Sequence, residues 1–175
     1  VHTFRLGGNY KYNEQSQLGL SYTSSLNPDK QQSVTSSDNH STTFNHAPAE
    51  EQMHNVALNY TSGFGLTGGI DYTYFRNKEE QSFRSIENNG QETTFLSNTV
   101  QYINRWKVYV DQNHTLSNAW VLNYGTSFTY VNNHNSQRYN LAAMSGMNKE
   151  SRVDEYTYNL YTGFEKNFGS QWSLN

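Results

Sequence analysis

Apolar and polar residues alternate along most of the chain. In the first run, Phe4, Leu6, Tyr10 and Tyr12 share one set of alternate positions with Gly8, and polar or small residues separate them. The same alternation recurs at 17–22, 56–60, 64–74, 100–111, 120–130, 156–165 and, briefly, 172–174. A period of two is typical of a β-strand with one apolar and one polar face. The pattern predicts an all-β fold of about eight antiparallel, up-and-down strands.

The connections between these runs differ in length in a regular way. Short, turn-like segments lie at 13–16, 61–63, 113–118 and 169–171. Long polar segments, expected to be loops, lie at 24–52, 77–94 and 132–153. Because short and long connections alternate, all the turns fall at one end of the sheet and all the long loops at the other. This asymmetry is typical of outer-membrane β-barrels.

Aromatic residues gather at two levels of the expected strands. Tyr10, Tyr60 and Trp120 lie near the short turns, and Tyr22 and Tyr130 lie near the long loops. Between these levels the apolar positions are mostly aliphatic: Leu6, Leu18, Leu20, Val56, Leu58, Leu66, Ile70, Leu122 and Leu160. Amphipathic rings favour the two lipid headgroup levels, and aliphatic carbon favours the hydrocarbon between them. The pattern therefore predicts a surface made for a membrane.

The composition narrows the protein class further. Only 34% of the 175 residues are hydrophobic, but aromatics make up 15%, and there are 14 Tyr. No stretch approaches the roughly 18–20 apolar residues of a membrane-spanning helix. The absence of cysteine excludes disulfides, thiolate zinc sites and cysteine nucleophiles. The net charge of −3 gives no basic footprint for nucleic acid, so no nucleic-acid partner is expected.

The repeated strand segments carry a resemblance to a known family. They are LGLSY at 18–22, VALNY at 56–60, LTGGIDY at 66–72 and YTYNLYTGF at 156–164, joined by long Asn- and Ser-rich segments. In these features the whole chain resembles the C-terminal barrel of TonB-dependent receptors, of the outer-membrane type common in Bacteroidetes. That resemblance implies a 22-stranded barrel in the Gram-negative outer membrane, with an N-terminal plug domain, and uptake of a siderophore, cobalamin or glycan driven by the TonB system.

Several features of that family have no counterpart between residues 1 and 175. The sequence has no signal peptide at Val1, no plug-like stretch and no candidate TonB box. We therefore expect residues 1–175 to be a single barrel segment excised from a larger barrel, with the plug and the TonB system outside this chain. Such a fragment would close on itself, pair through its sheet edges, or bury the apolar faces of two copies.

Two sets of residues are candidates for contact with a transported solute. One set consists of charged residues on the polar sides of the strands, expected to face the barrel lumen: Arg5, Lys11, Asp71, Arg105, Lys107, Asp111 and Glu165. The other set lies on the expected long loops and combines aromatic rings with guanidinium groups: Phe83, Arg84, Arg138 and Tyr139. Rim aromatics with arginines suit the capture of sugars or anionic chelates.

Metal binding and catalysis find little support in the sequence. His40, His46 and His54 are spaced too widely for a compact ligand set, and we expect them to be solvated. There is no Gly-x-Ser-x-Gly segment, and the Glu50-Glu51 and Glu79-Glu80 pairs are not opposed carboxylates. The sequence predicts neither an enzyme nor a cofactor.

Two other functions fit the same strand pattern. A small, self-contained outer-membrane barrel would serve adhesion or membrane integrity through its loops. A soluble β-barrel would instead turn its apolar face inward around a ligand. The two aromatic levels favour a receptor or transporter barrel over the soluble alternative.

Overall fold

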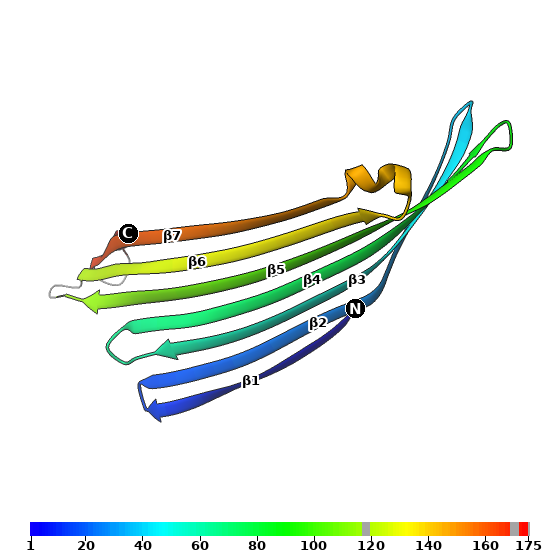
Figure 1. Cartoon of the computed structure of the whole chain (residues 1–175). Helices are drawn as coiled ribbons and strands as arrows, with labels where there is room; N and C mark the ends of the chain where they lie inside the picture. The colour runs from blue at the N-terminus through cyan, green and yellow to red at the C-terminus, as the bar shows by residue number, and fades with distance from the viewer. Residues whose placement is uncertain (117–119, 169–171, 175) are drawn as a thin grey trace.

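The computed structural model describes residues 1–116, 120–168 and 172–174, and its strands form one antiparallel sheet in the order β1 to β8 (Figure 1). The strands are β1 His2–Asn13, β2 Ser16–Ser37, β3 Ser41–Thr61, β4 Leu66–Glu87, β5 Glu92–Thr115, β6 Trp120–Tyr139, β7 Lys149–Phe168 and β8 Trp172–Leu174. Each strand pairs with the next one along the chain. The predicted all-β, up-and-down fold is confirmed.

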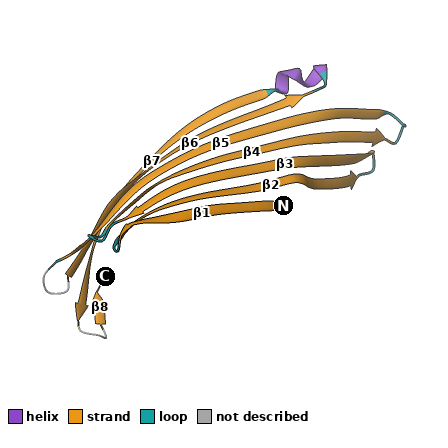
Figure 2. Cartoon of the chain, turned by 90° about the horizontal axis from the view of Figure 1, so that it is seen from below, coloured by secondary structure: helices purple, strands orange, loops and turns teal. Residues whose placement is uncertain are grey.

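The sheet is curved and open (Figure 2). Within the described residues, β1 pairs only with β2, and β7 pairs with β6 and with the three residues of β8. One short 3₁₀ helix, η2 Ala142–Met147, lies between β6 and β7. In the described part of the chain, no helix has the length and apolar character needed to cross a membrane.

Tight turns close the sheet at one end, here called the turn end. Ser62 organises the connection between β3 and β4: its Oγ accepts a hydrogen bond from Leu66 N at 2.9 Å. Gly65 has φ +89°, in the left-handed region that favours glycine. The turns expected near 13–16 and 61–63 are confirmed, and β5 runs on to Thr115. Residues 117–119 and the turn expected at 169–171 lie outside the described residues.

At the opposite end, the hairpin end, the long loops predicted at 24–52 and 77–94 are wrong, and the loop predicted at 132–153 is shorter, because β6 continues to Tyr139 and β7 begins at Lys149. The β2–β3 ladder continues to Ser37 and Ser41, and the β4–β5 ladder continues to Glu87 and Glu92. The two hairpin tips project beyond η2 (Figure 1). The alternation fades there because both faces of the sheet are polar, while the backbone hydrogen bonding that defines a strand does not depend on side-chain polarity.

The register keeps apolar side chains on one face of the sheet, here called the apolar face. Directly opposed residues of antiparallel strands share a face. One such row runs unbroken across seven strands: Leu6, Tyr22, Val56, Tyr72, Trp106, Tyr130 and Tyr156. The next row toward the turn end contains Gly8, Leu20, Leu58, Ile70, Val108, Phe128 and Tyr158.

Aromatic residues border this face at two levels, as the sequence predicts. In the outer row the rings of Tyr72 and Trp106 lie 4.5 Å apart between centroids, and those of Tyr130 and Tyr156 lie 5.0 Å apart. At the turn end, Lys166 Nζ lies 4.7 Å from the ring centroid of Trp120. A cation on an indole ring suits a membrane border, where the apolar body of each side chain is buried and the charge reaches water.

The sheet has almost no core of its own. Among the described residues, the buried hydrophobic side chains are Ala47 and Ala49 alone. Large apolar side chains are open instead: Leu160 is 87% exposed and Tyr158 is 76% exposed. A single sheet has two faces and no second layer, so the apolar face has to be covered by something outside the sheet.

The opposite, polar face is held together by tyrosines that lie across glycines. Tyr109 of β5 passes over Gly69 of β4, and its OH donates to Asn59 Oδ1 of β3 at 2.9 Å. Tyr161 of β7 passes over Gly125 of β6 in the same way and donates to Asp111 of β5. Each ring thus joins three strands, and the missing Cβ of the glycine makes room for it.

We predict that Gly69→Ala destabilises the folded protein by about 1–3 kcal/mol, as overpacking does. An added Cβ would lie 2.7 Å from Tyr109 Cε1 and 2.8 Å from the backbone oxygen of Leu58. Gly8→Ala is the matched control, because a Cβ there meets nothing within 4 Å. Urea unfolding of the detergent-folded protein measures both variants. Equal stability of the two would contradict the packing described here.

Candidate functional site

The charged residues predicted to line a lumen do share one face, the polar face. Asp71 and Lys107 are direct cross-strand partners, and Arg5 lies in the same row as Arg105. Glu165 lies on this face near the turn end of β7, in register with Val121. Lys11 and Asp111 share another row of this face, and the seven residues are spread from β1 to β7 and do not converge on one point. The face is a charged lining and not a compact site.

Hydrogen bonds within the sheet satisfy part of this lining. Asn55 Nδ2 donates to Asp71 Oδ2 at 3.0 Å, and Thr73 Oγ1 donates to Asp71 Oδ1 at 3.3 Å. Lys107 Nζ lies 5.6 Å from the ring centroid of Tyr109. The Asp71 carboxylate therefore has neutral donors from two strands, which is how a charge on a partly buried face is kept stable.

The four residues predicted on long loops lie on strands β4 and β6 near the hairpin end. Phe83 and Tyr139 are on the polar face. Their neighbours along the chain, Arg84 and Arg138, point to the apolar face, because successive residues of a strand alternate. The predicted combination of rings and guanidinium groups is therefore divided between the two faces of the sheet.

Phe83 and Tyr139 are brought together by a residue that the sequence analysis missed. Phe95 of β5 is the direct partner of Phe83, with ring centroids 4.6 Å apart and an interplanar angle of 17°. The rings of Phe95 and Tyr139 are 6.4 Å apart. We call Phe83, Phe95 and Tyr139 the aromatic cluster. Asn-Asn-Gly at 88–90 is a turn signal that, taken as a hairpin tip, would have paired Phe83 with Phe95.

Polar groups surround the aromatic cluster on the same face. Gln137 Nε2 donates to Tyr139 OH at 3.0 Å and to Ser97 Oγ at 3.4 Å, and Ser97 is only 1% exposed. Asn45 is the direct partner of Phe83 on β3. Its Oδ1 atom is buried and has no hydrogen-bond partner among the described residues. The surface thus combines half-buried rings with amide and hydroxyl groups.

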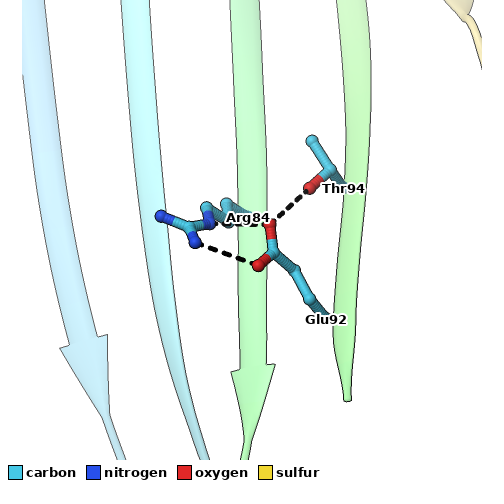
Figure 3. A network of polar contacts seen from close by, with 3 residues as sticks. All are labelled: Arg84, Glu92 and Thr94. Atoms are coloured by element: carbon cyan, nitrogen blue, oxygen red, sulfur yellow. Dashed lines mark hydrogen bonds and ion pairs between the residues drawn. The ribbon is translucent and has the colours of Figure 1, made fainter. Parts of the chain in front are cut away.

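Arg84 is held by an ion pair on the other face of the same hairpin (Figure 3). Its Nε donates to Glu92 Oε1 at 2.8 Å and its Nη2 donates to Glu92 Oε2 at 2.9 Å. These hydrogen bonds, together with the charge of Arg84, lower the pKa of Glu92 below its ordinary value of 4.5. The contact fixes the hairpin tip and occupies the guanidinium group.

The histidines do not form a metal site. His54 stacks between Tyr22 and Tyr74, and its Nδ1 lies 2.8 Å from Tyr22 OH. His46 Nδ1 lies 2.9 Å from Ser33 Oγ. In the part of the chain that the structure describes, no three His, Asp or Glu residues are close enough together to hold a metal ion.

Comparison with known proteins bears on the fold. No family model matches the sequence, and no curated protein matches it. The unliganded ferric citrate transporter FecA has a similar structure, with a TM-score of 0.61 and 10% identity over 98% of this chain and 25% of that chain. The ferric yersiniabactin uptake receptor FyuA from Yersinia pestis is also similar, with a TM-score of 0.56 and 8% identity over 93% of this chain and 24% of that chain.

These similarities show that the strands are arranged as in part of an outer-membrane receptor barrel. The chain spans about a quarter of the length of either receptor. At this level of identity the fold is shared, whereas substrates and partners do not follow from it.

We predict that the Arg84–Glu92 pair protects the β4–β5 hairpin tip at neutral pH and loses this effect in acid. The pKa of Glu92 is lower in the folded state than in the unfolded state, so the stabilisation is present above about pH 4.5 and disappears as the pH falls through the folded value. Amide hydrogen exchange at residues 84–94, compared between the Glu92→Gln variant and the unmodified protein, measures the protection of the hairpin tip. Protection should differ at pH 7 and converge as the pH falls below 4.5 and through the folded pKa of Glu92; a constant difference would argue against the ion pair.

Proposed function

We propose that this chain is part of the barrel of an outer-membrane receptor that takes up a small solute or glycan with energy from the TonB system. The observation that carries the proposal is the apolar face: it is exposed across seven strands and bordered by aromatic residues at two levels. Outer-membrane lipid is the partner that fits such a face. The fold shared with FecA and FyuA supports the same conclusion.

The height of the apolar face agrees with a membrane. Trp120 and Tyr130 mark its two borders on β6. They are separated by about 33 Å along the strand at roughly 3.3 Å per residue, which is about 25 Å along the membrane normal at a tilt of about 40°. The apolar band of outer-membrane barrels is about 25 Å tall.

With the apolar face in the membrane, the two ends and the polar face of the sheet take definite positions. The turn end faces the periplasm and the hairpin end faces the outside, as in other barrels of this class. Residues 1–175 form one segment of a larger barrel, whose other strands cover the free edges of β1 and β7. The polar face, with Arg5, Asp71, Arg105, Lys107 and Glu165, lines the interior and contacts the solute or a plug domain supplied by sequence outside this chain. Phe83 and Tyr139 are the solute contacts nearest to the outside.

We predict that Leu160→Arg lowers the stability of the membrane-inserted protein by about 2–4 kcal/mol, the cost of a cation near the midplane of a barrel. Asn159→Arg, the adjacent residue on the polar face, should be close to neutral. Folding titrations in lipid vesicles measure both. In a soluble protein, Leu160 at 87% exposure would tolerate arginine. Equal tolerance at the two positions would therefore contradict lipid contact and favour a soluble protein.

We also predict saturable, energy-dependent uptake. Deletion of the gene in its own host should abolish accumulation of one labelled solute among ferric siderophores, cobalamin and glycans. A protonophore should abolish the same uptake in the parent strain, because the TonB system draws on the inner membrane. Unchanged uptake of all three classes after deletion would exclude a receptor function and favour an adhesion or structural barrel.

A further inference from the structure

We propose that the aromatic cluster of Phe83, Phe95 and Tyr139 binds a neutral saccharide rather than an anionic metal chelate. The inference rests on the proposed receptor function and chooses among the solute classes that this function leaves open. Three features of the hairpin end carry it: the geometry of the rings, the hydrogen-bonding groups beside them, and the placement of the charges.

The rings form a surface of the kind that sugars pack on. Phe83 and Phe95 stack face to face at 4.6 Å, so each covers one face of the other, and Tyr139 is tilted by 52° against Phe95. The outer ring faces and the ring edges, which are half-buried, are the parts that a ligand would contact. The C–H groups on one side of a pyranose ring are apolar and carry partial positive charge. They pack against the negative face of an aromatic ring, a contact that does not require a charged ligand.

The polar groups around the rings are matched to hydroxyl groups. Gln137 on one side and Asn45 on the other carry neutral amide groups that can both donate and accept. Ser97, at 1% exposure, accepts a hydrogen bond from Gln137 and helps to hold that amide beside Tyr139. Asn45 Oδ1 has no donor among the described residues. Rotation about the soft χ2 torsion of Asn45 would present this oxygen to a ligand, and sugar hydroxyls are donors that would satisfy it.

Among the described residues, no charged side chain is a same-face neighbour of Phe83 or Phe95, whereas Lys149, the partner of Gln137, lies diagonally beside Tyr139. The same-face positions flanking the two phenylalanine rings, Thr43, Ala47, Gln81, Ser85 and Thr93, are all uncharged. Glu79 and Lys149 occupy the next row toward the membrane, with opposite signs. Lys30 on this face pairs with Glu51 at 2.7 Å. The field at the cluster therefore has no net positive source of the kind that attracts a carboxylate or ferric chelate.

The arginines of the chain are also badly placed for an anion at this surface. Arg84 and Arg138 lie on the other face of the sheet, and Arg84 is engaged by Glu92. Arg105 lies on the polar face, but ten positions from Phe95 along β5, or about 33 Å at roughly 3.3 Å per residue. An anionic chelate at the cluster would thus lose its hydration without gaining an arginine.

The test uses the full-length protein in detergent and isothermal titration with defined probes. The neutral probes are maltoheptaose, cellohexaose, xylohexaose, mannohexaose and chitohexaose, and the anionic probe is ferric citrate. We expect at least one neutral oligosaccharide to bind. Tyr139→Ala and Phe95→Leu should each weaken its affinity by about tenfold, the second while keeping most of the side-chain volume.

Matched controls separate the cluster from the rest of the hairpin. Phe44 lies on β3 at the same level as the cluster but on the opposite face, 40% exposed, so Phe44→Ala should leave the affinity within about twofold. The Arg84→Ala, Arg138→Ala double variant should do the same. Gel mobility with and without heating shows which variants have folded, and only folded variants are compared.

Two outcomes would overturn the proposal: ferric citrate binding that depends on the cluster, or no binding by any of the five oligosaccharides. Either would leave the receptor function standing if uptake remains saturable and sensitive to a protonophore and if Leu160→Arg impairs insertion. Failure of those two measurements would overturn the receptor function itself, whatever the saccharides do.

Discussion

The backbone ladder between consecutive strands is the interaction on which the rest of the structure depends. It carries one row of residues from β1 to β7 without a change of face, so that Leu6 and Tyr156 lie on the same side of the sheet. A slip of one residue in any strand would move its leucines to the polar face and its charges to the apolar face. The register irregularities of the first two ladders are confined to the ends: one lies between Lys11 and Asn13 at the turn end, and the other between Asn27 and Lys30, beyond Leu26. Both irregularities lie outside the aliphatic part of the apolar face, where a slip would exchange leucines for polar residues.

The sequence predicts the strands correctly where one face of the sheet is apolar and the other is polar. Between Trp120 and Tyr130 the alternation is strong, because one face is apolar and the other is not. Past Tyr74 on β4 both faces are polar, the period-two pattern weakens, and the strand is mistaken for a loop although its hydrogen bonds continue to Glu87. Hydrophobic periodicity reports a difference between faces and not the presence of a strand.

The same limit explains the errors in the candidate site. Once β4 is known to run past Tyr72 without a bulge, counting by twos places Arg84 on the apolar face and Phe83 on the polar face. Counting from Tyr130 separates Arg138 from Tyr139 in the same way. Residues adjacent in the sequence suggest one site only if they lie on a loop. Phe95 can be identified as the partner of Phe83 only when the position of the hairpin tip is known. Gly90, with φ +85°, sets that position, and composition alone does not reveal it.

The distribution of charge along the polar face gives the sheet two chemically distinct zones. At membrane depth, Asp71 receives hydrogen bonds from Asn55 and Thr73, and Asp111 receives one from Tyr161, so charges are kept there with neutral donors close by. Near the hairpin tips, rings and amides replace them. A solute approaching from the hairpin end would meet the rings and amides first, then the charges of Glu79, Lys149 and the Lys30–Glu51 pair, and Arg105 only about 33 Å beyond Phe95. Recognition by stacking would therefore precede selection by the charges at membrane depth, because their local fields are screened over such a distance by water and salt.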